Sequence, residues 1–129
     1  MLSSPIIDFL IRIKNAYAVN KKMVVSPSSK FKVAVAQLLV DHSYLKSFKI
    51  EGEKKKTITL QLSYPSQKKS LHGLKIYSKP GRRLYHSFST FPWAKHKKSI
   101  IIISTSKGIL SHRQAIKAEV GGELIAELW

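Results

Sequence analysis

The chain has 129 residues, of which 23 are Lys or Arg and 7 are Asp or Glu, giving a formal charge of +16. This length suits one typical domain or two small ones, and an apolar content of 43% argues against disorder. Without cysteine, the chain has no disulfide, no thiolate catalysis and no cysteine-ligated zinc. No apolar run exceeds the four residues Ile100–Ile103, which is far too short to span a bilayer.

Positive charge is spread along the whole chain. Residues 1–70 carry 13 basic and 4 acidic side chains, and residues 71–129 carry 10 and 3. Lys outnumbers Arg by 19 to 4, and a lysine acts as a hydrated point charge that follows phosphates without reading bases. This distribution indicates a nucleic acid as the partner. A merely solubilising surface is the alternative, but solubility needs far less net charge.

The first half of the chain predicts an α-β-α-β-β unit. Ser4-Pro5 is a typical helix start, and apolar residues then recur at helical spacing as far as Tyr17. The turn at 26–29 supplies an N-cap for a second helix, and clean alternation at 57–63 predicts a strand. In chain order, the expected elements are a helix from Pro5 to about Ala18–Asn20, a strand at 23–25, a helix ending near His42, and strands at 48–50 and 57–63 joined by Glu51–Lys56.

The second half predicts a mainly β unit with one short helix. Ile100–Ile103 has the continuous β-branched content of a fully buried strand, and Ser111 with Gln114 predicts a capping box. The polar segment Tyr64–His72 is the best candidate for a link between two domains. We therefore expect an α+β protein with an N-terminal α/β domain at 1–64, a linker at 65–72 and a C-terminal domain at 73–129. Further expected elements are strands beginning at Leu74 and Leu84, a loop at Ser104–Gly108, a helix to Ala118 and a strand at Glu123–Trp129.

A search for catalytic and metal sites finds no candidate. The five histidines lack metal-ligand spacing, and no glycine-rich phosphate loop or nucleophile elbow occurs. Glu51 and Glu53 flank Gly52 in a turn and are expected to be solvated. We expect no catalytic residue, no metal and no cofactor. A basic hydrolase with an unrecognised site is the remaining enzymatic alternative, which a nuclease assay would test.

Two segments of the C-terminal half combine groups that suit RNA. In Ser104–Gly108, three hydroxyl residues follow the buried strand, then Lys107 adds charge and Gly108 allows close backbone approach. In Ser78–Arg83, Pro80-Gly81 sets a bend that three cations surround. Tyr85, which follows, could stack on a base or belong to the core. Taken singly, each segment could equally be an ordinary polar loop.

Taken together, these segments resemble the bacterial type of the small-subunit ribosomal protein eight family. The resemblance covers nearly the whole chain, in order and without large insertions. The motifs that carry it are Pro5–Asp8, Arg12–Ala16, Pro27–Lys30, Ser78–Gly81, Arg83–Tyr85, Ser104–Gly108, Arg113–Ala115 and Gly121–Glu123, with Trp129 at the end.

The resemblance implies a non-enzymatic constituent of the small ribosomal subunit. It would bind the central domain of the small-subunit rRNA beside neighbouring ribosomal proteins and support assembly. In some relatives the same surface represses translation of the messenger of its own operon, and the sequence does not separate the two roles. The implied RNA-binding residues are Ser104, Thr105, Ser106, Lys107, Gly108, Lys79, Pro80, Gly81, Arg82, Arg83, Tyr85 and Glu123 in the C-terminal domain, and Arg12, Lys14, Asn15, Ser28, Ser29 and Lys30 in the N-terminal domain.

The chain departs from the family pattern in two places. The glycine pair usual before the buried strand is absent from Phe91–Ser99. The glycine expected after the second helix is replaced around His42-Ser43, so an altered C-cap is expected. The expected location is a bacterial cytoplasm, with an organelle ribosome as the alternative, and no membrane partner.

Overall fold

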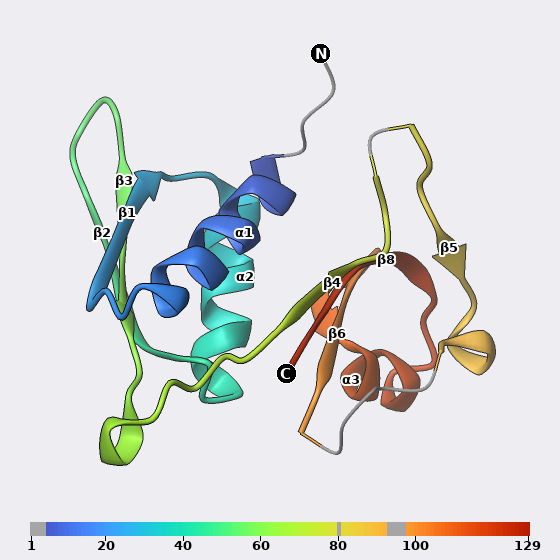
Figure 1. The fold of residues 1–129 in the computed structure, drawn as a ribbon. Helices are drawn as coiled ribbons and strands as arrows, with labels where there is room; N and C mark the ends of the chain where they lie inside the picture. Colours follow the sequence, from blue (N-terminus) through green and yellow to red (C-terminus); the bar gives the residue numbers. More distant parts are fainter. Residues whose placement is uncertain (1–4, 80, 93–97) are drawn as a thin grey trace. The chain divides into compact units, whose positions relative to one another are not determined.

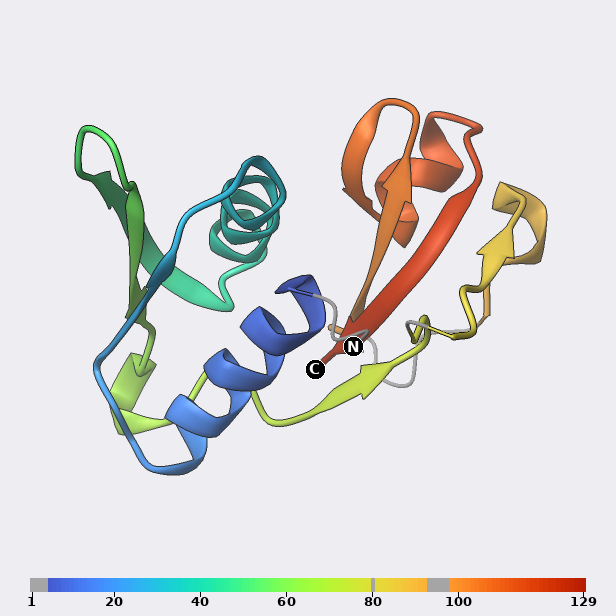
Figure 2. The same cartoon turned by 90° about the horizontal axis from the view of Figure 1, so that it is seen from above.

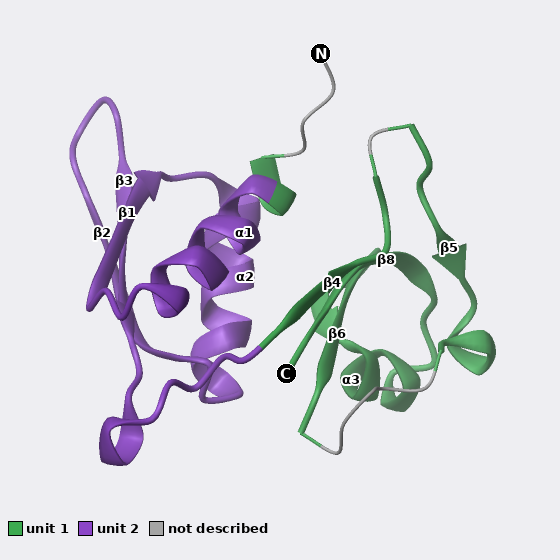
Figure 3. Cartoon of the chain, in the orientation of Figure 1, with its two compact units in different colours: residues 1–7, 73–129 green, residues 8–72 purple. Residues whose placement is uncertain are grey.

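A computed structural model describes residues 5–79, 81–92 and 98–129 of the chain (Figure 1). The chain divides into two compact units, which are coloured in Figure 3: unit 1 comprises Met1–Ile7 with Gly73–Trp129, and unit 2 comprises Asp8–His72. The elements of unit 2 follow the predicted α-β-α-β-β order. They are α1 (Pro5–Ala18, whose first turn is assigned to unit 1), β1 (Met23–Pro27), α2 (Lys30–Asp41), β2 (Leu45–Glu51), β3 (Thr57–Leu62) and the short 3-10 helix η1 (Pro65–Gln67).

Unit 2 is a three-stranded antiparallel sheet with two helices on one face, as Figures 1 and 2 both show. The strand order is β1-β3-β2, so β3 is central. The register sets Val24 opposite Leu60, and both side chains are buried because alternate residues of each strand point towards the helices. The apolar stripe of α1, which includes Phe9 and Ile13, completes this core.

The ends of α2 explain how the chain enters and leaves this helix. The Ser29 hydroxyl accepts from the Lys32 amide, which confirms the predicted N-cap. At the other end Ser43 takes a left-handed conformation with φ of 64°. The Tyr44 amide then donates to Leu39 O at 2.8 Å. A serine therefore occupies the backbone position that usually selects glycine, and the usual hydrogen bonds of the cap are kept, so the expected alteration of the C-cap is limited to the residue type.

The C-terminal part of the chain forms a five-stranded antiparallel sheet. Its main order is β4-β8-β6-β7, and β5 also pairs with β8. The capping box predicted at Ser111 and Gln114 is present at the start of α3. The elements are β4 (Leu74–Ile76), β5 (Tyr85–His86), the 3-10 helix η2 (Phe88–Thr90), β6 (Ile100–Thr105), β7 (Gly108–Ser111), α3 (His112–Lys117) and β8 (Gly122–Leu128).

One face of this sheet packs against α3. Ile101, Ile103, Leu124 and Ala115 of α3 are fully buried in one cluster. The pairing of β6 with β8 shifts between Ile102 and Ile103, so one extra residue of β8 bulges there. The four isoleucines of β6 are all buried, so both faces of this strand are covered, which explains the unbroken apolar run in the sequence.

Several details differ from the sequence-based expectations. The segment Ser104–Gly108 is not a loop, because Ser104 and Thr105 extend β6 and Gly108 starts β7, a strand that was not predicted. None of the described helices is both long and apolar enough to cross a membrane.

Candidate nucleic-acid interface

The β6–β7 hairpin presents the hydroxyl-rich segment on a tight and internally bonded turn. Thr105 pairs with Gly108, so only Ser106 and Lys107 remain in the turn, and both are exposed. The Thr105 hydroxyl donates to Gly108 O at 2.8 Å and accepts from the Lys107 amide at 3.0 Å. Gly108 has φ of 110°, a conformation that side-chain-bearing residues rarely adopt. The Thr105 hydroxyl thus shapes the turn, and the Ser106 hydroxyl is left facing solvent.

Three strands bring predicted site residues from distant parts of the chain into one row. Glu123 of β8 lies opposite Tyr85 of β5 on one side and opposite Ser104 of β6 on the other. Directly opposed residues of neighbouring strands place their side chains on the same face of a sheet. We name Tyr85, Glu123 and Ser104 the cross-strand row. It combines an exposed aromatic ring, a carboxylate and a hydroxyl.

Two glycines allow the strands that carry this row to approach closely. A Cβ on Gly122 would overlap the carbonyl group of Ser104, and a Cβ on Gly121 would come 2.5 Å from His86 O. Both obstacles are backbone atoms, which cannot swing aside as a flexible side chain can. The Gly121-Gly122 motif is therefore required by the packing of β8 between β5 and β6.

Glu123, the charged residue of the cross-strand row, has a basic neighbour outside the row. Its side chain is only 15% exposed and lies 3.9 Å from Arg83 Nη1. Arg83 partly neutralises the Glu123 carboxylate, and the Arg83 side chain itself stays well exposed. Tyr85 is 66% exposed, which leaves its ring face open to stacking rather than buried in a core. An RNA ligand would find a cation, an aromatic ring and hydrogen-bond acceptors together here.

The other basic turn of the C-terminal part is also held firmly. Lys79 and Arg82 exchange both backbone hydrogen bonds, at 3.0 and 2.9 Å, and so form an isolated antiparallel bridge. The buried Ser78 hydroxyl accepts from the Leu84 amide and fixes the base of the turn. Gly81 is exposed, and the predicted site residue Pro80 lies outside the described residues.

In unit 2, two of the predicted RNA-binding residues at the start of α2, Ser28 and Ser29, form hydrogen bonds within the protein. The Ser29 hydroxyl caps α2, and the half-buried Ser28 donates its amide to Lys56 O at 2.9 Å. Lys30 is exposed. Sequence reasoning missed Lys32, whose ammonium donates to Ser26 Oγ and Pro27 O and lies 5.6 Å from the Phe9 ring centroid. No local motif signals this role, because it depends on α1 and β1 meeting α2.

The predicted residues of α1 separate onto two sides of the helix. Arg12 and Asn15 line a groove of about 580 Å³ between α1 and β1, whereas Lys14 does not. Arg12 donates to Val25 O at 3.0 Å. The guanidinium thus covers a carbonyl at the free edge of β1.

Comparison with known proteins decides the family. The family model described as "Ribosomal protein S8" matches residues 4–129. The chain belongs to the ribosomal protein S8 family. Small ribosomal subunit protein uS8 of Mesomycoplasma hyopneumoniae strain 7448 is 43% identical over 128 residues, covering 99% of this chain and 98% of that protein. The uS8 proteins of Spiroplasma kunkelii and Fervidobacterium nodosum are 43% and 41% identical, with full coverage of both chains in each case.

Membership of the S8 family confirms the resemblance predicted from the motifs. The chain is a bacterial-type protein of the small ribosomal subunit, with a structural rather than an enzymatic role. The turns and the cross-strand row described above carry groups of the kinds that RNA-binding surfaces use. They supply cations, hydroxyls, an aromatic face and glycine-permitted backbone approach on strands that a buried core supports.

Proposed function

We propose that this protein binds the central domain of the small-subunit rRNA and supports its assembly into the subunit. The cross-strand row carries the proposal. Tyr85, Glu123 and Ser104 come from three strands and form a surface of mixed chemistry on a rigid sheet. Sequence-specific RNA recognition uses such groups on unstacked bases and on the 2′-hydroxyl, whereas cations alone follow phosphates.

We assign the two parts of the chain different shares of this binding. Residues 73–129 carry the row and the two basic turns, and they supply the specific contacts. Residues 1–64 add sequence-independent contacts through exposed cations such as Arg12, Lys14 and Lys30. The full set of proposed contacts remains the eighteen residues that the resemblance implied. Within that set, the structure supports structural roles for Thr105 and Ser29 in addition to any RNA contact.

Footprinting of the full-length protein on a transcript of the central domain tests the proposal. Protection of one compact site, retained against excess random RNA, is the expected result. Protection that random RNA abolishes would overturn it, because purely electrostatic binding lacks such preference. Incubating the transcript with protein alone also serves as a nuclease assay, and an intact transcript is expected.

Repression of the operon messenger is the second candidate function. A messenger that folds into the same RNA shape would occupy the same cross-strand row, since the row recognises local geometry and base edges. Excess central-domain transcript should then displace the messenger leader from the protein. Simultaneous binding of both RNAs to one protein molecule would contradict a shared surface.

A further inference from the structure

A structured basic surface occupies the segment that the sequence suggested was only a linker. Residues 63–70 form a closed loop, because Ser63 O accepts from both the Ser70 amide at 3.2 Å and the Ser70 hydroxyl at 2.9 Å. Two consecutive residues within it, Ser66 and Gln67, have φ of 53° and 64°. Left-handed conformations at non-glycine residues cost about 1–2 kcal/mol each and point to a conformation that the surroundings impose.

The loop is fastened to the end of α1. The Tyr64 hydroxyl donates to Lys21 O, and the Tyr64 ring lies 5.4 Å from the Tyr17 ring, centroid to centroid. The Leu62 amide donates to Lys22 O at 2.9 Å. The segment that holds Lys21 and Lys22 is therefore bonded directly to the strand and loop that lead to Lys68 and Lys69.

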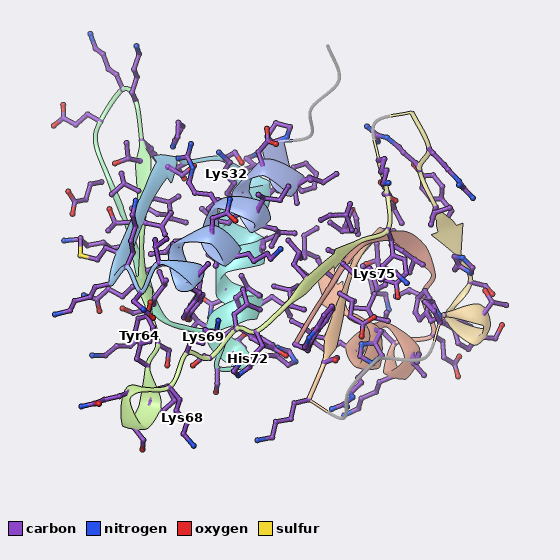
Figure 4. The ribbon with its side chains drawn as sticks, in the orientation of Figure 1. Lys32, Tyr64, Lys68, Lys69, His72 and Lys75 are labelled. Carbon is purple, nitrogen blue, oxygen red and sulfur yellow. The ribbon has the colours of Figure 1, made fainter. Side chains whose placement is uncertain are left out.

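All four of these lysines are exposed and lie in stretches of sequence that contain no acidic residue. The sequence has no Asp or Glu between Asp8 and Asp41, and none between Glu53 and Glu119. Lys49 pairs with Glu51 and Arg83 with Glu123, and none of the four lysines takes part in either ion pair. Figure 4 labels Tyr64, Lys68 and Lys69 around η1 and shows Lys68 extending away from the ribbon.

We propose that Lys21, Lys22, Lys68 and Lys69 form a further phosphate-binding surface on unit 2, which we name the linker patch. Its ligand is the RNA sugar–phosphate backbone, read without base preference. Lysines act as point charges suited to phosphate, and apart from Pro65 the other side chains of the loop carry hydroxyls or an amide, with no aliphatic anchor among them. The proposal rests on the proposed function, to which it adds a contact site that neither the motifs nor the resemblance indicated.

The linker patch has a matched control elsewhere in unit 2. Lys54 and Lys55 are also adjacent exposed lysines, but they stand in the β2–β3 turn close to Glu51 and Glu53. Changing either pair to glutamine removes the same charge and keeps a polar side chain. Any difference between the variants therefore reports position rather than total charge.

Filter binding of the intact protein to the central-domain transcript, over a range of salt, tests the linker patch. Lys68→Gln/Lys69→Gln should weaken binding several-fold and lower the salt slope by about one to two units, roughly 0.7–0.9 per lost phosphate. Lys21→Gln/Lys22→Gln should behave in the same way. Lys54→Gln/Lys55→Gln should change the slope less, and Lys68→Arg/Lys69→Arg should restore it.

The outcomes separate failure of the linker patch from failure of the proposed function. If wild-type protein shows no preference for the transcript, the proposed function fails. If wild type binds specifically but the patch variants match the Lys54/Lys55 control, the linker patch is overturned. Variants that bind RNA normally yet enter reconstituted subunits poorly would also overturn it, because the surface would then face a protein. Melting curves for each variant check that folding is intact.

Discussion

The imidazole of His112 continues the pairing of β6 at the point where β7 ends. The Ile101 amide donates to His112 Nδ1 at 3.0 Å, and both groups are buried. The β6–β7 register pairs Ile102 with Ser111, and the next residue, His112, opens α3. A side chain therefore takes the place that a strand backbone would have filled. This arrangement requires Nδ1 to carry a lone pair.

Replacing His112 tests this contact. His112→Leu removes the acceptor and should lower the free energy of unfolding by about 1–3 kcal/mol, because the buried Ile101 amide loses its partner. His112→Asn places an oxygen near the position of Nδ1 and should lose less. Hydrogen exchange of the Ile101 amide gives a local measurement. Equal protection of that amide in wild type and His112→Leu would contradict the assigned role.

Gly122 and Gly81 make a matched pair for testing close backbone approach. Gly122→Ala would drive a Cβ into the Ser104 carbonyl group, so it should cost about 2–3 kcal/mol or prevent β8 from pairing. Apart from its chain neighbours, no heavy atom of the described residues lies within 4 Å of a Cβ built on Gly81. Gly81→Ala should therefore change stability by less than about 0.5 kcal/mol. Denaturant unfolding of both variants measures the difference, and similar losses would argue against the steric explanation.

Tyr77 should titrate later than an ordinary tyrosine. Burial, together with the hydrogen bond to Glu127 at 3.0 Å and the charge of that carboxylate, raises the pKa of Tyr77 from 10.0 to about 12. The folded state thus favours the neutral phenol. Its contribution to stability is complete below pH 10 and is lost as pH rises from 10 towards 12, because the unfolded chain ionises first.

The ultraviolet absorbance of phenolate checks this titration. Tyr77→Phe should reduce the late-titrating component without abolishing it, because burial also raises the pKa values of Tyr17 and Tyr64. Glu127→Gln should bring the pKa of Tyr77 part of the way back towards 10.0, because burial remains when the charge is removed. An unchanged titration in Glu127→Gln would show that the carboxylate contributes nothing.

Ser106 and Lys55 separate base recognition from phosphate contact. The Ser106 hydroxyl is exposed on the β6–β7 turn and makes no hydrogen bond within the described part of the protein. Ser106→Ala should weaken cognate RNA binding by about 1–2 kcal/mol and random RNA less. Lys55→Ala should weaken both RNAs alike by less than about 1 kcal/mol. The test is the ratio of cognate to random RNA binding, measured for each of the two variants. If Ser106→Ala and Lys55→Ala gave equal ratios, the β6–β7 turn would not be a specificity element.

Much of the local structure was predictable from short-range patterns. The helical spacing of Phe9 and Ile13, the cap at Ser29 and the capping box at Ser111 each depend on residues a few positions apart. The ribosomal protein family followed from motifs in a fixed order, and the charge of +16 indicated a nucleic acid as the partner. Local propensity and composition determine these features, so they can be read before any tertiary contact is known.

Contacts between distant segments were decided only by the tertiary structure. The row of Tyr85, Glu123 and Ser104 depends on strand register, and the bulge between Ile102 and Ile103 changes which residues share a face. Lys32 reaches Ser26 and Pro27 because α2 folds back beside β1, and Tyr64 fastens the supposed linker to Lys21. Pairing register and side-chain hydrogen bonds across 40 or so residues depend on the packed core as a whole, which no local pattern encodes.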